Sequence, residues 1–416
     1  MNEKIQIIFG LLGGLAVFIY GMNMMSECLQ KAAGDKMKSI LALLTKNPLL
    51  GVLAGALTTA VLQSSSATTV MAIGFVSAGL MNLPQAISII FGANIGTTMT
   101  AQIIAFKISD YIYVIIFIGF LISFVTKSEK VKSIGQTIFA FGLLFLGIET
   151  MGDVMKPLAS SPVFTDLIGR VAHIPVLGVA VGTFMTLVVQ SSSATIAVLQ
   201  NFASQPGPDG VTSILGLAGA IPILLGDNIG TTITALLASI GQSKDAKRTA
   251  VAHCIFNISG CFLFIWFVKP FAALIQSISP KGPEIEVISR QIANAHTVFN
   301  ITMTLIWVCL IKLMVKIVMT LIPDGKKGVE DPGSPIYLDE NIISQPAAAL
   351  QLVAKEIFRM SDQVGDILKK TIELVKNDEV KSIDGLKENG EQVERLGKCI
   401  TEYLAALFSS GSLTEQ

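Results

Sequence analysis

A polar run that occurs twice inside apolar sequence constrains this chain more than any other feature. Gln-Ser-Ser-Ser-Ala-Thr fills residues 63–68 and returns at residues 190–195. A second motif, Asn-Ile-Gly-Thr-Thr, follows each copy at residues 94–98 and 228–232. Two motifs that recur in the same order indicate an internal duplication, which must be recognised before a fold is assigned.

Composition and charge place this duplication in a membrane. Of the 416 residues, 51% are hydrophobic and only 14% are charged, which is typical of an integral membrane protein. No charged residue occurs from Leu49 to Phe106, whereas the C-terminal part of the chain is polar and charged. We therefore expect a transmembrane domain over residues 1–322, a linker over 323–340 and a soluble segment over 341–416.

The same counts exclude several classes of function. A formal net charge of zero gives no reason to expect a nucleic-acid partner. The five cysteines show no CxxC or paired spacing, so they predict neither a disulfide framework nor a metal site. No GxSxG motif is present and the three histidines have no aspartate at a useful spacing, so we do not expect a serine hydrolase or another enzyme.

Seven apolar stretches are candidates for membrane spans, each of which needs about 20 residues. They are residues 5–25, 83–106, 111–125, 134–150, 211–240, 249–268 and 293–321. Two further apolar segments, 49–80 and 175–200, carry the polar runs in their middle and end in turns. We interpret them as re-entrant hairpins, because irregular backbone at membrane depth must line a cavity or be buried in protein. The first repeat then covers about 5–125, the second about 134–268, and 293–321 is the final span.

Basic residues predict the orientation in the membrane. Lysines and arginines gather in four places, at residues 31–46, 127–132, 244–248 and 326–327. Placing all four groups in the cytoplasm is consistent with seven spans, an outer N-terminus and a cytoplasmic C-terminal segment. An odd number of spans then separates the hairpins, so the repeats are predicted to be inverted. The chain is accordingly expected to be a multi-pass protein of the cell (inner) membrane.

The residues of the repeats favour a site for a small anion together with a cation. Half-helices that begin at the serine runs would offer free N–H groups and partial positive charge, and the hydroxyls add donors. Gln63, Gln190, Asn94 and Asn228 add amides that donate or accept hydrogen bonds. No lysine or arginine lies inside the hairpin segments 49–80 and 175–200, so a bound anion needs a cation beside it. Clusters of oxygen ligands suit sodium.

One carboxylate breaks the symmetry of the repeats. Asp227 stands where the first copy has Ala93. It either holds a cation or caps a half-helix. Proton coupling through Asp227 is a further alternative, because proton relays use carboxylates inside the membrane.

Two other recurring patterns have simpler interpretations. Glycines four residues apart, at 51/55 and 178/182, are typical of close helix packing. That packing does not explain the amide in each serine run. Residues 252–257 match residues 295–300 and place a histidine and an asparagine on one helix face in each copy. We interpret these as interhelical hydrogen bonds rather than as a metal site, since no carboxylate accompanies them.

The doubled motifs resemble those of the type II sodium–phosphate cotransporter family, and the similarity covers most of residues 1–322. That resemblance implies an all-α membrane protein, an inverted-repeat transporter with two re-entrant helical hairpins that carries inorganic phosphate into the cell with sodium. The residues it implies for phosphate binding are Gln63, Ser64, Ser65, Ser66, Gln190, Ser191, Ser192, Ser193, Asn94 and Asn228. Those it implies for sodium are Ser66, Thr68, Thr69, Thr97, Thr98, Ser193, Thr195, Asp227, Thr231 and Thr232.

The soluble segment shows helical spacing of apolar residues from Leu352 to Val375 and from Val393 to Leu404, with a break at Asn377. It resembles a PhoU-like helical domain but is short for one, so we predict a small, truncated helical domain. The expected partners are inorganic phosphate, sodium as coupling ion and the lipid bilayer, with no other cofactor, and a homodimer is a candidate assembly. Two alternatives stay open: transport of another oxyanion such as sulfate, and a phosphate-sensing membrane scaffold without net flux.

Overall fold

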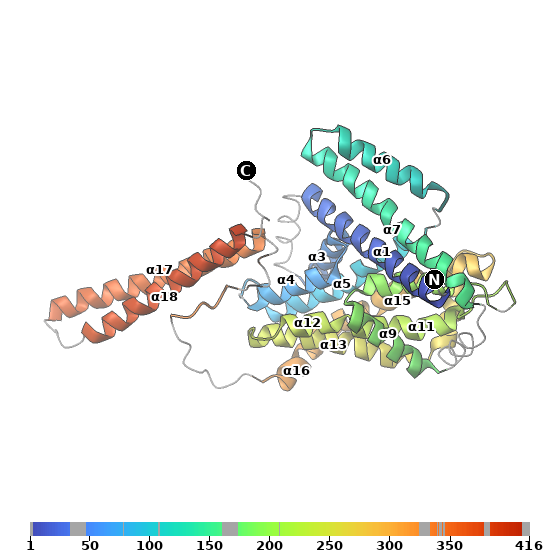
Figure 1. Cartoon of the computed structure of the whole chain (residues 1–416). Coiled ribbons are helices and arrows are strands. Elements are labelled where there is room, and N and C mark those ends of the chain that lie inside the picture. Colours follow the sequence, from blue (N-terminus) through green and yellow to red (C-terminus); the bar gives the residue numbers. More distant parts are fainter. Residues whose placement is uncertain are drawn as a thin grey trace.

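The structure is a computed structural model in which the chain forms a helical body with two long helices projecting from it (Figure 1). It describes residues 3–33, 47–77, 79–106, 109–159, 174–207, 209–323, 333–338, 340, 343, 346–377 and 383–409. Throughout these residues the regular elements are helices, which confirms the predicted all-α class. Basic residues Lys36, Lys38, Lys46, Lys326 and Lys327, together with His173, lie outside the described residues.

Five α-helices are described in the first repeat. They are α1 (Glu3–Ala33), α3 (Pro48–Leu62), α4 (Ser65–Ser77), α5 (Leu83–Ile104) and α6 (Ile112–Val125). Asn47 caps α3 by accepting from the backbone N–H of Leu49, and proline occupies the first turn, where a missing N–H costs nothing. Asn82 and Gln85 form a capping box at the start of α5.

The second repeat follows the same order as far as α5, whose counterpart is divided at Thr231 into two helices. Its helices are α7 (Glu129–Ala159), α9 (Pro175–Val189), α10 (Ser192–Ala203), α11 (Gly216–Gly230) and α12 (Thr232–Ala238). Helix α9 again begins with a proline, and Ser191 caps α10 by accepting from the backbone N–H of Ala194. Four further helices complete the body: α13 (Lys244–Ile265), α14 (Val268–Ile278), α15 (Glu284–Cys309) and α16 (Ile311–Leu321).

Six described helices are long and apolar enough to cross a membrane. They include α1, α5, α7, α13 and α15, and the sixth is the α11–α12 stretch, Gly216–Ala238. The predicted span 111–125 is only the 14-residue α6, about 21 Å long, which is short of the ~30 Å hydrocarbon core. The predicted final span 293–321 begins earlier, at Glu284, and is divided at Leu310 into α15 and α16.

Glycines set the arrangement of each hairpin. A Cβ built on Gly55 of α3 would stand 2.1 Å from the Ile89 carbonyl oxygen of α5, and one on Gly182 of α9 would stand 2.0 Å from that of Ile223 in α11. Only glycine permits backbones to approach so closely. The contacts advance in the same direction along both helices of each pair, so α3 runs parallel to α5 and α9 parallel to α11. Helices α4 and α10 must therefore return the chain, and each forms a hairpin with the helix before it.

The duplicated helices α1 and α7 pack against each other in opposite directions. Gly14 of α1 approaches Gly147 of α7, while Gly21, seven residues further along α1, approaches Ala140, seven residues earlier on α7. Each helix leads into its own hairpin, so the two repeats run in opposite senses. The later pair is also antiparallel, because Gly260 of α13 meets Met303 of α15 whereas Ser259 accepts from Trp307.

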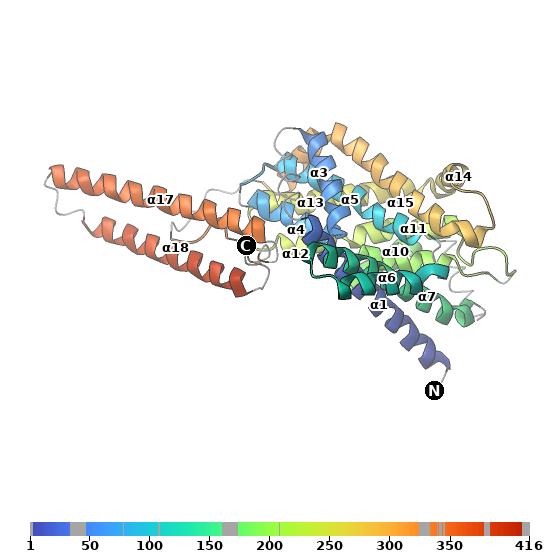
Figure 2. The same cartoon turned by 90° about the horizontal axis from the view of Figure 1, so that it is seen from above.

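The tail consists of two antiparallel helices that project from one end of the body, on the same side as the α6–α7 connection (Figures 1 and 2). They are α17 (Pro346–Asn377) and α18 (Ile383–Ser409), so the predicted break after residue 377 is confirmed. A buried carboxylate, Glu356, accepts from the backbone N–H groups of Ile336 and Tyr337 and pairs with Arg359, which fastens the linker to α17.

Candidate functional site

Each hairpin is broken at its glutamine. Gln63 has φ 51° and Gln190 has φ 53°, and these are the only non-glycine residues with positive φ in the described part of the chain. The left-handed conformation costs an ordinary residue about 1–2 kcal/mol, and such strain gathers at functional sites. The predicted tips of the hairpins therefore coincide with the two strained residues.

The first break leaves a set of unused donors. Ser64 Oγ accepts from the backbone N–H of Ala67 at 3.2 Å, and the Ser64 carbonyl accepts from that of Thr68 at 3.3 Å. The N–H groups of Ser65 and Ser66 belong to the first turn of α4, where the helix itself supplies no acceptor. Neither serine hydroxyl bonds to a residue that the structure describes.

The second break repeats this geometry. Ser191 Oγ accepts from the backbone N–H of Ala194 at 3.3 Å, and the Ser191 carbonyl accepts from that of Thr195 at 3.1 Å. Ser192 and Ser193, at the start of α10, again keep backbone N–H groups and hydroxyls without a described partner. Each break thus offers two amides and two hydroxyls at the positive end of a helix, which is suited to binding a small anion.

Two threonine pairs join the arms of the hairpins. Thr59 Oγ1 lies 2.9 Å from Thr68 Oγ1, and Thr186 Oγ1 lies 3.0 Å from Thr195 Oγ1. Sequence analysis identified Thr68 and Thr195 but missed Thr59 and Thr186. The signal was available, because a threonine stands four residues before the glutamine in both copies.

Asp227 lies beside the second pair. Its Oδ1 accepts from Thr186 Oγ1 at 2.6 Å, while Oδ2 is buried without a partner among the described residues. It sits inside α11 and caps no helix, so the capping interpretation is wrong. The buried oxygens of Asp227 lie beside the hydroxyls of Thr186 and Thr195. This group has more hydrogen-bond acceptors than donor protons, so it is suited to binding a cation.

Four other predicted threonines present only lone pairs to a ligand. Each donates its single hydroxyl proton to a backbone carbonyl three or four residues earlier, as Thr97 does to Ala93 at 2.9 Å and Thr231 to Asp227 at 2.9 Å. Thr98 and Thr232 do the same. Such hydroxyls can ligate a cation but cannot donate to an anion. Thr69 Oγ1 is buried and has no described partner.

The predicted asparagines tie the repeats to the later helices. Asn94 Oδ1 lies 3.2 Å from His253 Nε2, and Asn228 Oδ1 lies 3.2 Å from His296 Nε2. Each asparagine also donates its amide to a carbonyl of its own helix. Among the described residues no cluster of metal-ligating side chains occurs, and the interhelical bonds confirm the interpretation of the histidine pairs.

The two glutamines differ. Gln63 is buried, donates to the Ala60 carbonyl and accepts from Thr100 Oγ1 at 3.0 Å. Gln190 is exposed, and its side-chain amide bonds to no residue that the structure describes. The amide of the second hairpin is therefore free to bind a ligand.

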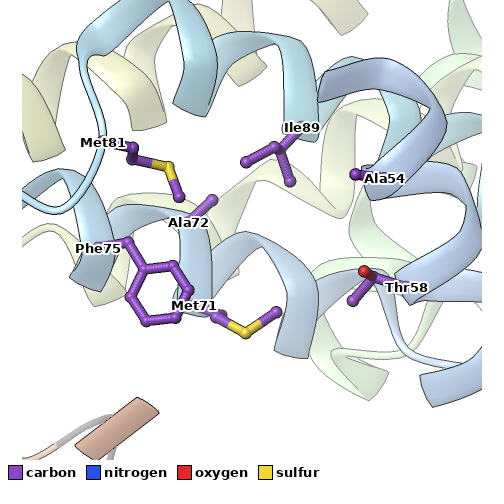
Figure 3. A pocket seen from close by; sticks show the side chains of 7 residues that line it. All are labelled: Ala54, Thr58, Met71, Ala72, Phe75, Met81 and Ile89. Carbon is purple, nitrogen blue, oxygen red and sulfur yellow. The ribbon is translucent and has the colours of Figure 1, made fainter. Parts of the chain in front are cut away.

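Both hairpins contact the opposite repeat. The returning helix α4 packs against α12 and α13, and the returning helix α10 packs against α5 and α15. A small cavity between α3, α4 and α5 is lined by Ala54, Met71, Phe75 and Ile89 among others (Figure 3). Thr58 supplies its only side-chain oxygen, so this cavity is too apolar to hold an anion.

A sequence model of the Na+/Pi-cotransporter family matches this chain twice, over residues 17–153 and 147–279. The chain belongs to that family. The double match confirms the duplication and the suspected family, and makes the chain a transport protein of the membrane rather than an enzyme. The tail lies outside both matches, so its PhoU-like character stays a prediction.

Individual relatives of the family agree with this assignment. An uncharacterized protein of Bacillus subtilis is 34% identical over 263 residues, which are 63% of this chain and 83% of that protein. The "Putative inorganic phosphate export protein YjbB" of Salmonella typhimurium is 24% identical over 95% of this chain and 70% of its own length. Human "Sodium-dependent phosphate transport protein 2B" is 33% identical over 142 residues, 32% of this chain and 19% of that protein. No solved structure matches the chain.

Proposed function

We propose that this protein carries inorganic phosphate into the cell together with sodium, by alternating access to a site between the two hairpin breaks. The observation that supports this most strongly is the pair of breaks at Gln63 and Gln190, each with free amides and hydroxyls at a helix start. In this proposal the hairpins are re-entrant, since arms of 15 and 13 residues, about 22 and 20 Å, are too short to cross the bilayer.

The anion site consists of neutral donors. The hydroxyls of Ser65, Ser66, Ser192 and Ser193, with their backbone N–H groups, surround the phosphate oxygens. Protonated phosphate also carries a hydrogen that needs an acceptor, and the free amide of Gln190 supplies one. Sulfate has no proton at neutral pH, so this acceptor would favour phosphate over sulfate.

Sodium is proposed to bind beside the second break. Asp227, Thr186, Thr195 and the Ser191 carbonyl form the oxygen-rich group described above. The first repeat has Ala93 in place of the aspartate, so a cation site there would contain only neutral oxygens. The two repeats are thus expected to bind sodium with different strength.

Uptake of the anion needs a co-transported cation to offset the membrane potential, and in this proposal the cation is sodium. An inside-negative membrane potential opposes anion entry by about 2.3 kcal/mol per charge for each 100 mV. Each sodium ion that enters with phosphate cancels one such charge. A tenfold sodium gradient adds about 1.4 kcal/mol per ion.

Export is a second candidate, because the relative that matches 95% of this chain is named for phosphate export. A symporter follows its combined gradients, so tight sodium coupling favours uptake, whereas an uncoupled carrier would release accumulated phosphate.

Labelled-phosphate flux in proteoliposomes tests the proposal. We expect uptake to need an inward sodium gradient and to be insensitive to excess sulfate. Sodium-independent efflux would support export instead. Phosphate binding without any flux would contradict both and favour a sensing scaffold.

A further inference from the structure

An arginine stands shortly before the histidine in each of the duplicated helices α13 and α15, one position out of register, and the surroundings of the two differ. Arg248 precedes His253 by five residues, and Arg290 precedes His296 by six. Arg248 is buried, and its charge is neutralised by Asp245 at 2.7 Å. Arg290 is half-buried and pairs with no carboxylate among the described residues. Of these two arginines, only Arg290 therefore keeps a positive charge that no described carboxylate neutralises.

The guanidinium of Arg290 is held by one nitrogen. Nη1 donates to the Gln102 carbonyl oxygen at 3.1 Å and to Gln102 Oε1 at 2.6 Å, which uses both of its hydrogens. The group also lies over the Phe106 ring, 4.5 Å from its centroid. Gln102 is fixed in turn by donating to Asn294 and Thr297. The Nε–H and Nη2–H edge bonds to no residue that the structure describes, and that edge matches two oxygens of an oxyanion.

The backbone next to Gln102 and Arg290 contacts the second hairpin. Gln200 of α10 donates to the Ala101 carbonyl at 3.1 Å and to the Ser289 carbonyl at 2.9 Å, the neighbours of Gln102 and Arg290. Gln200 stands eight residues beyond Ser192, about 12 Å along the helix. An anion at Arg290 would thus be roughly two helical turns from the second serine run.

We propose that Arg290 is a capture site for the phosphate oxyanion at one mouth of the transport path. This inference rests on the proposed function, because the binding groups between the hairpins carry no positive charge and gain from a cation that concentrates the anion nearby. Arg290 lies near the start of α15, and the Lys244–Arg248 group lies at the start of the antiparallel α13, so the two are at opposite ends of the body. In the predicted orientation the mouth at Arg290 is the outer one.

Two substitutions distinguish the effect of the charge of Arg290 from the effect of the shape of its guanidinium group. Arg290→Gln removes the charge and keeps a polar side chain with an amide donor. Arg290→Lys keeps the charge but loses the two-pronged edge, which a lysine cannot reproduce. Lys281→Gln removes a charge from the exposed loop before α15, where the lysine only donates to the Gln276 carbonyl, and serves as the matched control.

The test is the phosphate dependence of sodium-driven uptake by right-side-out and inside-out membrane vesicles containing the full chain. For Arg290→Gln we expect KM to rise about tenfold in right-side-out vesicles with the maximal rate retained there. In inside-out vesicles KM should be unchanged and the maximal rate should fall by the same factor, because detailed balance fixes the ratio of maximal rate to KM between the two directions. The KM of Arg290→Lys should lie between those of the wild type and Arg290→Gln, and the KM of Lys281→Gln should equal that of the wild type. The wild-type KM should also rise with ionic strength more steeply than that of Arg290→Gln.

Three outcomes would overturn the inference. The first is an unchanged KM of Arg290→Gln in right-side-out vesicles when the wild-type flux is normal. The second is an equal rise of KM in both kinds of vesicle. The third is a loss of maximal rate in right-side-out vesicles without a change in KM, which would indicate a structural role in the Gln102 network. Absence of flux in the wild type would contradict the proposed function as well.

Discussion

Thr186 and Thr195 hold their hydroxyl oxygens 3.0 Å apart across the break in the second hairpin, and Asp227 from the neighbouring helix accepts from the same Thr186 oxygen. The first hairpin has the same threonine pair without the carboxylate. The carboxyl group that distinguishes the repeats is therefore hydrogen-bonded directly to the threonine pair that joins the two hairpin arms. A cation bound there would stabilise the broken conformation that exposes the serine donors.

Loss of one serine hydroxyl should impair transport without unfolding the protein. In Ser192→Ala the removed hydroxyl has no described partner in the protein, but a hydrogen bond to a charged group is worth about 1.5–3 kcal/mol. Uptake at limiting phosphate should fall roughly 10- to 100-fold, and Ser65→Ala should behave alike. Wild-type rates, measured beside an unchanged melting temperature, would show that the hydroxyl does not contact phosphate.

Replacing Asp227 by asparagine should alter the sodium dependence. Asp227→Asn keeps an oxygen for Thr186 but removes the charge proposed to bind the cation. We expect half-maximal uptake to need at least several times more sodium, while phosphate KM at saturating sodium stays near the wild-type value. Identical sodium titrations for the two proteins would exclude Asp227 as a sodium ligand.

The bonds between histidine and asparagine should be stabilising and replaceable by a suitable donor. His253→Leu leaves Asn94 Oδ1 buried without its partner, which costs about 1–3 kcal/mol of stability. His253→Gln places an amide near the Nε2 position and should recover much of that loss. Thermal unfolding in detergent measures both variants. Equal melting temperatures for His253→Leu and His253→Gln would mean that the hydrogen bond contributes nothing to stability.

Glycine at position 55 should be required for hairpin packing. A Cβ there would stand 2.1 Å from the Ile89 carbonyl, so in Gly55→Ala the helices α3 and α5 must separate at a cost of about 1–3 kcal/mol. Gly13→Ala is the control, because a Cβ at Gly13 meets nothing within 4 Å. Alanine is the better helix former there, and this variant should be neutral or slightly stabilised. Similar stability of the two variants would argue against the close approach.

Sequence alone could predict the positions of both breaks because the signal is local. A glutamine and three serines inside apolar sequence cannot be satisfied in a lipid-facing helix, and the structure puts the strained residues at Gln63 and Gln190. The duplication was equally visible, since it depends only on the order of motifs.

Features that depend on contacts between distant helices were not visible. The hydrogen bond between Asn94 and His253 joins residues 159 positions apart. A sequence motif does not indicate which distant helix its side chains will contact. The division of the last span at Leu310 and the shortness of α6 also escaped prediction, because hydropathy measures apolar content and not where a helix axis changes direction. The proposed sodium ligand Thr186 was missed although its spacing from Gln190 repeats that of Thr59 from Gln63.

The central claim, that the two hairpin breaks share one phosphate, is tested most directly by joining them. Two hydroxyls that each donate a bond of about 2.7 Å to the same phosphate lie within roughly 8 Å of each other. Ser65→Cys and Ser192→Cys, combined in a chain whose five native cysteines are replaced, can be treated with a bifunctional thiol reagent of matching length. We predict an intramolecular cross-link that forms with the double variant and with neither single one. Two cysteines that each react with a monofunctional reagent but never cross-link would contradict the account.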